Sequence, residues 1–297
     1  MIGINIGGDL GNQMFRYACG RALVELKGDD DFVLRFVNKN HSLLEFNILK
    51  KRILKKDIVL SEGSFWQKFL YVFFKLLYKF IPVKDRNLIK YPSLLVKNGV
   101  CMAGNINDFN LSPALKNDKI FMNGTFENPI YFKNIRAILK KEFTPKHTML
   151  AKNKDLFRII TTTNSVCVSI RRGDFLSTAN KGWFDVCKKD YFITAIKKMQ
   201  ELVKDPVFIF FSNDIKWAKE NIHIEGECYF ESGDDPVWET LRLMYSCKHF
   251  IISNSTFHWW AQFLSDNPNK IVISPNRWYN APGPYPLILD DFYKIKV

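Results

Sequence analysis

The chain has 297 residues, with a hydrophobic content of 47% and a charged content of 25%. These values exclude a disordered protein, and the length suits two domains of ordinary size better than one. The formal net charge of +13 is densest between residues 50 and 90, where it would attract an anionic partner: nucleic acid, an anionic lipid surface or a phosphorylated substrate.

The six cysteines are widely spaced, with neither a C-x-x-C pair nor the spacing of a zinc site. Free thiols in a reducing compartment explain this pattern better than a disulfide framework. The opening MIGINIGGDLGNQMF lacks the basic region of a signal peptide. We therefore expect a cytoplasmic protein.

The N-terminus predicts a strand over Ile2–Ile6, a glycine turn, and a helix from Asn12 to about Leu26. The helix start would present backbone N–H groups to an anion or a sugar hydroxyl. A tight turn that only packs the strand on the helix is an equally good interpretation. The spacing is not G-x-G-x-x-G, so the dinucleotide fingerprint is missing.

Residues 64–81, SFWQKFLYVFFKLLYKFI, form the most hydrophobic segment. Three lysines interrupt it and Pro82 ends it, so a membrane-spanning helix is excluded. Lys68, Lys75 and Lys79 share one stripe of the predicted helix. This favours a helix lying in a bilayer interface, and the alternative is a core helix with a solvated lysine stripe.

The remaining elements alternate along the chain. Residues 98–125 read as irregular with a strand near Lys119–Met122, residues 128–143 as a helix, and TPKHT (144–148) as a break near a domain boundary. Beyond it, strands at 166–170, 207–211, 228–230, 250–253 and 270–274 alternate with helices at about 190–203, 214–221, 236–246 and 256–264. Such alternation predicts a parallel, doubly wound sheet.

Polar residues follow several of these strands, where ligands bind in such sheets. Arg171 and Arg172 end the buried run VCVSI and should meet an anion. Asn254, Ser255 and Thr256 open a helix whose N–H groups would face the same ligand, and the combination predicts a pyrophosphate site. Ser212 and Asp214 end another strand, although capping is the better interpretation of Asp214.

Five segments together resemble the alpha-1,2-fucosyltransferases, glycosyltransferase family 11. They are GDLGNQMFRYA (8–18), GTFENPIYF (124–132), SIRRGDF (169–175), FSNDIKW (211–217) and NSTFHWW (254–260). The resemblance implies an α/β fold of the GT-B type, with two facing Rossmann-like domains and parallel sheets. Residues 1–147 would form the acceptor side and 148–297 the GDP-fucose donor side.

The resemblance also implies an inverting, metal-independent enzyme without a cofactor, which moves fucose from GDP-fucose to O2 of a terminal galactose. The expected partners are GDP-fucose and a galactose-terminated glycan, lipid-linked if 50–90 contacts the membrane, and no nucleic acid. We expect one arginine of the pair to contact the pyrophosphate while the other orients it or pairs with Asp174. The candidate residues are Arg171, Arg172, Asp174 and Glu127 for catalysis; Arg171, Arg172, Gly11, Asn12, Ser212, Asp214, Asn254, Ser255 and Thr256 for the donor; and Asp9, Gln13 and Glu127 for the acceptor.

The chain departs from the family pattern at three positions. Ser169 stands where the family has a histidine, Asp9 where glycine is frequent, and Glu127 where glutamine is usual. The base stays open among Asp9, Glu127 and Asp174. The alternatives are a glycosyltransferase using another GDP-sugar or forming another linkage, a nucleic-acid-binding protein, and an oxidoreductase, which the missing fingerprint disfavours.

Overall fold

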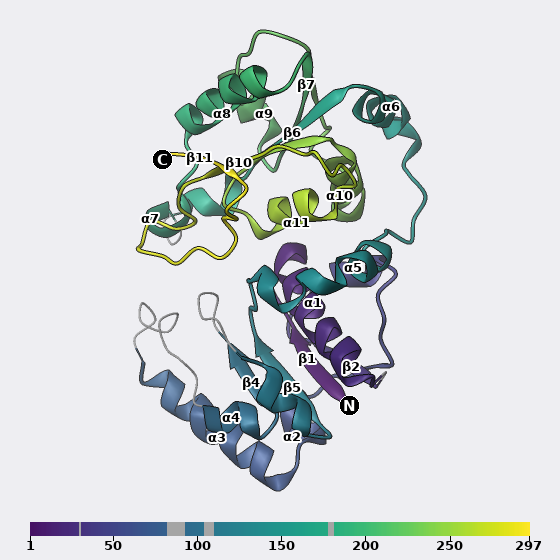
Figure 1. Ribbon diagram of the computed structural model, residues 1–297, viewed down its shortest axis with the longest axis vertical. Coiled ribbons are helices and arrows are strands. Elements are labelled where there is room, and N and C mark those ends of the chain that lie inside the picture. The colour runs from purple at the N-terminus through teal and green to yellow at the C-terminus, as the bar shows by residue number, and fades with distance from the viewer. Residues whose placement is uncertain (30, 82–92, 104–109, 178–180) are drawn as a thin grey trace. The chain divides into compact units, whose positions relative to one another are not determined.

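A computed structural model describes the 297 residues except 30, 82–92, 104–109 and 178–180 (Figure 1). The chain divides into two compact units, Met1–Phe143 and Thr144–Val297. The division falls at the start of TPKHT, near the expected domain boundary. Each unit is built on its own parallel sheet, as the predicted α/β fold requires.

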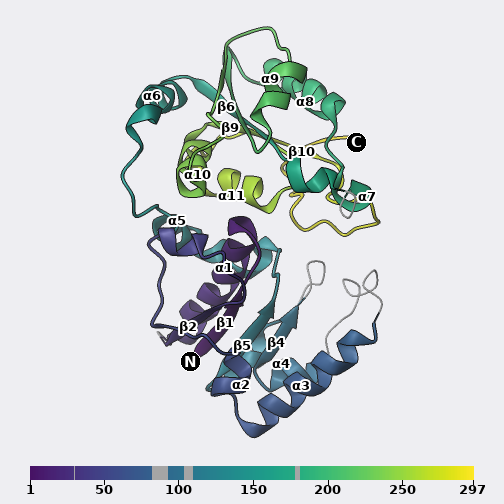
Figure 2. The ribbon, with the colours of Figure 1, turned by 180° about the vertical axis from the view of Figure 1, so that it is seen from behind.

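The first unit has a five-stranded sheet in the order β3-β2-β1-β5-β4, with all pairs parallel. One face carries α2, α3 and α4, which enclose a hydrophobic cluster with the strands, and the other face carries α1 and α5 (Figures 1 and 2). The elements are β1 (Ile2–Ile6), α1 (Leu10–Lys27), β2 (Phe32–Phe36), η1 (Ser42–Glu45), β3 (Arg52–Ile53), α2 (Ile58–Glu62), α3 (Phe65–Lys79), α4 (Ser93–Lys97), β4 (Val100–Ala103), η3 (Ser112–Lys116), β5 (Ile120–Gly124), η4 (Pro129–Tyr131), η5 (Lys133–Ile135) and α5 (Arg136–Glu142).

The second unit has a six-stranded parallel sheet in the order β11-β10-β9-β6-β7-β8. This is the doubly wound order in which the chain leaves the first strand in one direction and later returns to its other side. The elements are η6 (Ala151–Asn153), α6 (Lys154–Thr162), β6 (Asn164–Ile170), η7 (Gly173–Leu176), α7 (Lys181–Phe184), α8 (Lys189–Leu202), β7 (Pro206–Ser212), α9 (Ile215–Asn221), β8 (Cys228–Phe230), α10 (Val237–Ser246), β9 (His249–Ile252), α11 (Thr256–Leu264), β10 (Val272–Pro275) and β11 (Tyr293–Ile295).

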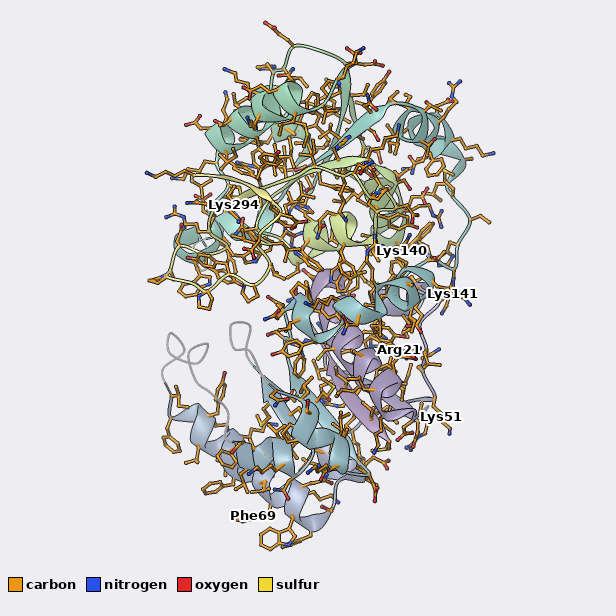
Figure 3. The ribbon with its side chains drawn as sticks, viewed as in Figure 1. Arg21, Lys51, Phe69, Lys140, Lys141 and Lys294 are labelled. Atoms are coloured by element: carbon orange, nitrogen blue, oxygen red, sulfur yellow. The ribbon has the colours of Figure 1, made fainter. Side chains whose placement is uncertain are left out.

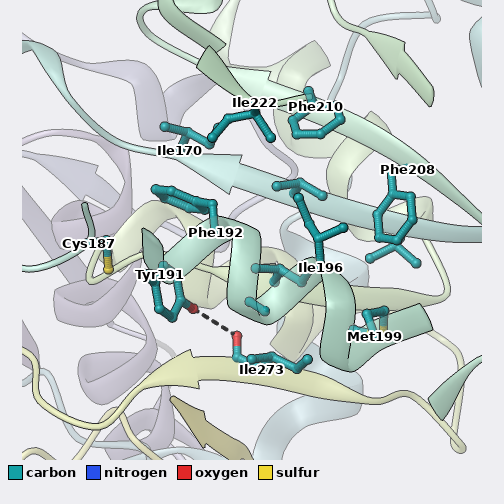
Figure 4. Packing of buried hydrophobic residues seen from close by; sticks show 14 of the residues in the cluster. Ile170, Cys187, Tyr191, Phe192, Ile196, Met199, Phe208, Phe210, Ile222 and Ile273 are labelled. Carbon is teal, nitrogen blue, oxygen red and sulfur yellow. Dashed lines mark hydrogen bonds between the residues drawn. The ribbon is translucent and has the colours of Figure 1, made fainter. Parts of the chain in front are cut away.

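The core of the second unit lies between this sheet and the helices α8 and α9. Phe192, Ile196 and Met199 of α8 pack on alternate residues of the strands, among them Ile170 and Phe210 (Figure 4). Both faces of the central strand β6 are buried, which is why VCVSI contains no charged residue. The cysteines of both units carry free thiols, as predicted.

Two expectations for the middle of the chain were wrong. Residues 98–125 contain a second strand, β4, which follows a turn at Gly99 (φ 73°) and pairs with β5. Residues 128–143 form an α-helix only at their end. Phe132, with a φ of −142°, separates the two short 3-10 turns from each other, and Ile135, with a φ of −107°, separates the second turn from α5. Short strands between Gly and Asn residues lack the apolar period that identifies longer elements.

The hydrophobic segment 64–81 is helical, as predicted. Ser64 and Gln67 form a capping box at the start of α3, and the helix ends at Lys79. None of the helices in the described part of the chain is both long and apolar enough to span a bilayer.

Candidate functional site

The carboxyl edge of the second sheet has a switch point between β6 and β9, where the connections leave the two neighbouring strands in opposite directions. Ligands of doubly wound proteins bind outside this point. Ser169 of β6 lies beside Ile252 of β9, so Arg171 follows one strand and Ser253 the other at almost the same level. Two sequence-predicted segments are therefore neighbours in space.

Arg172 points toward β7 and α9. Its Nε donates a hydrogen bond to Oδ2 of Asp214 over 3.3 Å, and its guanidinium lies 3.7 Å from the ring centre of Trp217. Its backbone N–H donates to Oδ1 of Asn213 over 2.9 Å. Gly173 is required beside this contact, because a Cβ there would lie 2.2 Å from Nδ2 of Asn213. An ion pair, a stacked ring and the backbone thus hold Arg172 in one orientation.

Arg171 lies on the opposite side of the chain, since consecutive residues at a strand end alternate in direction. Its guanidinium is 5.6 Å from the ring centre of Phe175. The charge of Arg171 also reaches His258 in the first turn of α11, where it adds to burial in lowering the pKa of the imidazole to about 3. Arg171 is therefore the arginine of the pair that lies toward the switch point and the start of α11.

The start of α11 is held from within the unit. Oγ of Ser253 lies 2.8 Å from Nδ1 of His258, and Nδ2 of Asn254 donates to the backbone oxygens of Phe184 and Trp278, each over 3.0 Å. Nδ2 of Asn254 therefore fixes the loop, and only other atoms of this predicted donor residue could meet a ligand. Ser255 is the N-cap residue and makes no side-chain cap, and Thr256 begins the helix.

Two further predicted donor residues serve the turn after β7. Asp214 caps α9 by accepting from the backbone N–H of Trp217 over 3.2 Å, which agrees with the capping interpretation. Oγ of Ser212 accepts from the backbone N–H of Asp214 over 3.0 Å. Both positions support Arg172. The backbone of Asp174 lies in η7, and its side chain is outside the described part of the structure.

Ser169, at the family's histidine position, is fully buried, and its Oγ donates to the backbone oxygen of Ile251 over 3.1 Å. It fastens β6 to β9 below the switch point. Sequence reasoning missed Arg277, which follows β10, the strand next to β9. Its Nε is buried and has no hydrogen-bond partner among the described residues. The signal was present in the strand-end segment VISPNRW, but nothing in a linear sequence places β10 beside β9.

The first sheet has its own switch point, between β1 and β5. Gly8, with a φ of 79°, turns the chain into α1, whose first turn contains Gly11 and Asn12. Asp9 is exposed, and its Oδ1 accepts from Nδ2 of Asn40 over 3.3 Å.

Gln13 has a role other than the predicted acceptor contact. It is fully buried, its Nε2 donates to the backbone oxygens of Gly8 and Asn40, and its Oε1 accepts from the backbone N–H of Leu43. A side chain enclosed in this way cannot touch a substrate. Gln13 instead holds the glycine turn in place.

Glu127 follows β5 and is buried, directly after Phe126, which has a φ of 55°. A bulky residue in the left-handed region marks a strained turn. Arg16 of α1 lies near enough for the Glu127 charge to oppose the lowering of the Arg16 pKa by burial. Nε of Arg16 is buried without a partner in the described residues. Sequence reasoning missed Arg16 because it occupies the variable position of GNQMFRY.

In the described ranges, no group of three or more His, Cys, Asp or Glu residues could hold a metal ion. What the second unit offers is cationic: Arg171 after β6, Arg277 after β10 on the far side of β9, and the amide-rich opening of a nine-residue helix. Guanidiniums and helix N-termini are the groups that bind phosphate oxygens.

Comparisons with known proteins agree with this architecture. Residues 103–291 match the model of Glycosyl transferase family 11. The O-antigen biosynthesis glycosyltransferase WbnK of Escherichia coli is 27% identical over 314 residues, 98% of this chain and 99% of its own length. The alpha-1,2-colitosyltransferase of Escherichia coli is 30% identical over 284 residues, 92% of this chain and 91% of its own.

Among solved structures, the fucosyltransferase NodZ from Bradyrhizobium superposes with a TM-score of 0.51 at 12% identity, covering 89% of this chain and 92% of its own. Two parallel α/β units confirm the predicted GT-B fold class. With a family model that matches more than half of its residues and a relative at 30% identity along nearly its full length, the chain belongs to glycosyltransferase family 11.

Proposed function

We propose that this glycosyltransferase moves fucose from GDP-fucose to O2 of a terminal galactose, with inversion at the anomeric carbon. The observation that carries the proposal is the position of Arg171 at the switch point, beside the start of α11. Arg172 supports it from the side, because Asp214 and Trp217 fix it against β7 and α9. A nucleoside diphosphate is the ligand class that such a cationic strand end recognises.

In the proposed reaction the acceptor hydroxyl forms a bond to C1 of fucose as the bond from C1 to the β-phosphate oxygen breaks. The electron pair of that bond goes to the departing GDP, and the hydroxyl proton is lost. Arg171 neutralises the charge that develops on the β-phosphate, and Arg277 follows β10, two strands away from β6. Preorganised donors of this kind contribute roughly 3–4 kcal/mol each to transition-state stabilisation.

In this proposal the base that receives the proton is one of three carboxylates: Asp9, Glu127 or Asp174. Of these, Glu127 is buried just after the carboxyl end of β5, near Arg16. Asp9 lies exposed at the start of α1. A strongly oxocarbenium-like transition state would reduce the need for any base.

The relative named for O-antigen biosynthesis supports a surface polysaccharide as the acceptor. The alternative is transfer of another sugar from its GDP conjugate. Colitose is the sugar to test first, because the chain is 30% identical to an alpha-1,2-colitosyltransferase.

The test is incubation with GDP-fucose, GDP-colitose, GDP-mannose or a uridine diphosphate sugar and a panel of galactosides, with and without EDTA, followed by linkage analysis of the products. We expect a 2-linked fucosyl product that forms equally well with EDTA. Exclusive use of GDP-colitose would establish the alternative. Turnover only with a uridine diphosphate sugar, or none with any GDP-sugar alongside no GDP binding, would overturn both.

A further inference from the structure

Helix α3 exposes an apolar face that no other described element covers. Eight large apolar side chains are between 41% and 85% exposed: Phe65, Trp66, Phe69, Val72, Phe73, Leu76, Leu77 and Phe80. In Figure 3, Phe69 projects from the outer side of the first unit. The rings form a continuous run, since Trp66 meets Phe69 edge-on and Phe69 stacks on Phe73. Monomeric proteins rarely expose large contiguous apolar patches, and eight large apolar side chains on one helix form such a patch.

The opposite face of α3 is fixed to the unit, so the helix cannot turn its exposed residues inward. Nε2 of Gln67 donates to the backbone oxygens of Asn98 and Lys119, over 2.9 and 3.0 Å. The hydroxyl of Tyr71 donates to Oδ2 of Asp57 over 3.0 Å, and Leu70 is buried beside it. The apolar face is therefore an outer surface of the folded unit.

Three lysines follow the edge of this face. At about 100° per residue, Lys75 and Lys79 lie within about 20° of Lys68 around the helix. By the same count, the eight exposed apolar residues occupy the adjoining arc, from about 40° to about 180°. The helix thus has a buried face, a lysine row and an apolar face, in that order around its circumference. This is the arrangement of helices that lie in a bilayer interface, where lysine stems reach the headgroups.

The charge of the region selects an anionic bilayer over a second copy of the chain. Lys51, Arg52, Lys55 and Lys56, just before α2, are exposed, and the excess of basic over acidic residues is greatest between 50 and 90. Two such faces would bring like charges together in a dimer, whereas anionic headgroups attract them. Trp and Phe are also the residues that enter the boundary between headgroups and acyl chains.

We infer that α3 docks the first unit on an anionic membrane surface, with its aromatic side chains among the acyl chains and its lysine row at the headgroups. This goes beyond the proposed transfer reaction and holds for either donor sugar. It would place the enzyme where a lipid-carried glycan is presented.

The test is flotation of the full chain with phosphatidylcholine vesicles, with and without phosphatidylglycerol. We expect binding to the anionic vesicles that weakens as salt is raised. The triple variant Trp66→Ser, Phe69→Ser, Phe73→Ser should bind at least about tenfold more weakly. The double variant Lys75→Gln, Lys79→Gln should lose roughly tenfold on anionic vesicles and little on neutral ones. The matched control is Leu26→Ser with Ile130→Ser, which removes two equally exposed apolar side chains outside α3.

Thermal unfolding and GDP binding establish that each variant is folded, and GDP binding reports separately on the proposed function. Absence of vesicle binding by the wild type, or equal binding by the triple variant, would overturn the inference. So would a concentration-dependent dimer in solution that the triple variant abolishes, because the face would then be a self-association surface.

Discussion

The adjacent residues Arg171 and Arg172 should respond differently to replacement by alanine. Arg172→Ala removes a stacked contact with Trp217 and a half-exposed ion pair with Asp214. Such contacts contribute about 1 kcal/mol and about 0.5 kcal/mol, so the second unit should lose about 1.5 kcal/mol of unfolding free energy.

Arg171→Ala removes a longer ring contact, 5.6 Å to Phe175, and also removes a charge that opposes protonation of His258. Stability should change by less than about 0.5 kcal/mol. Turnover should fall by roughly 10²–10³, because the developing phosphate charge loses a preorganised donor. Arg171→Lys should restore part of the turnover, because lysine keeps the positive charge but lacks the planar guanidinium.

The assays are release of GDP at saturating donor and urea unfolding monitored by tryptophan fluorescence. Arg158→Ala is the matched control, since the side chain of Arg158 is 74% exposed on α6 and its loss should change neither quantity. If Arg171→Ala keeps more than about a tenth of the turnover while Arg172→Ala loses it at unchanged stability, the two roles are reversed and the reasoning from strand direction fails.

Three further outcomes follow from buried groups. Glu142→Ala should cost the first unit about 3 kcal/mol in urea unfolding, because Nε of Arg21 lies 2.7 Å from the Glu142 carboxylate and would stay buried without it, whereas Glu25→Ala, at the exposed end of the same network, should cost under about 1 kcal/mol. The pKa of His258 is about 3 in the folded state against 6.5 ordinarily, so the unfolded state binds more protons between these values. The free energy of unfolding should therefore decrease as the pH is lowered below 6.5, by at most about 1.4 kcal/mol per pH unit from this group. His258→Asn should flatten this dependence, and an identical slope in both proteins would contradict the assignment. Gly173→Ala, at a φ of 28° and against Asn213, should cost about 1–3 kcal/mol and reduce turnover with it, and unchanged thermal unfolding would argue against that strain.

The sequence alone determined the elements with a strong period and the residues that follow them. The run VCVSI must be buried on both faces, so RRGD had to emerge at its end, and the strand limits in the second unit agree with the structure to within about two residues. The family motifs identified the chemistry because they combine residue types that a fold alone does not require. The strands β2, β3 and β11 were not foreseen, since each includes a basic residue and none is a long uninterrupted apolar run.

Tertiary structure decided everything that depends on which strands are neighbours. The order β10-β9-β6-β7 places Arg277 and the start of α11 on one side of Arg171, and Asp214 with Trp217 on the side of Arg172. Nothing local encodes that order, because each strand is apolar and would pair equally well with several others. The same holds for α3, which is apolar around most of its circumference. The tertiary contacts of Gln67, Leu70 and Tyr71 determine which face is buried and which stays exposed.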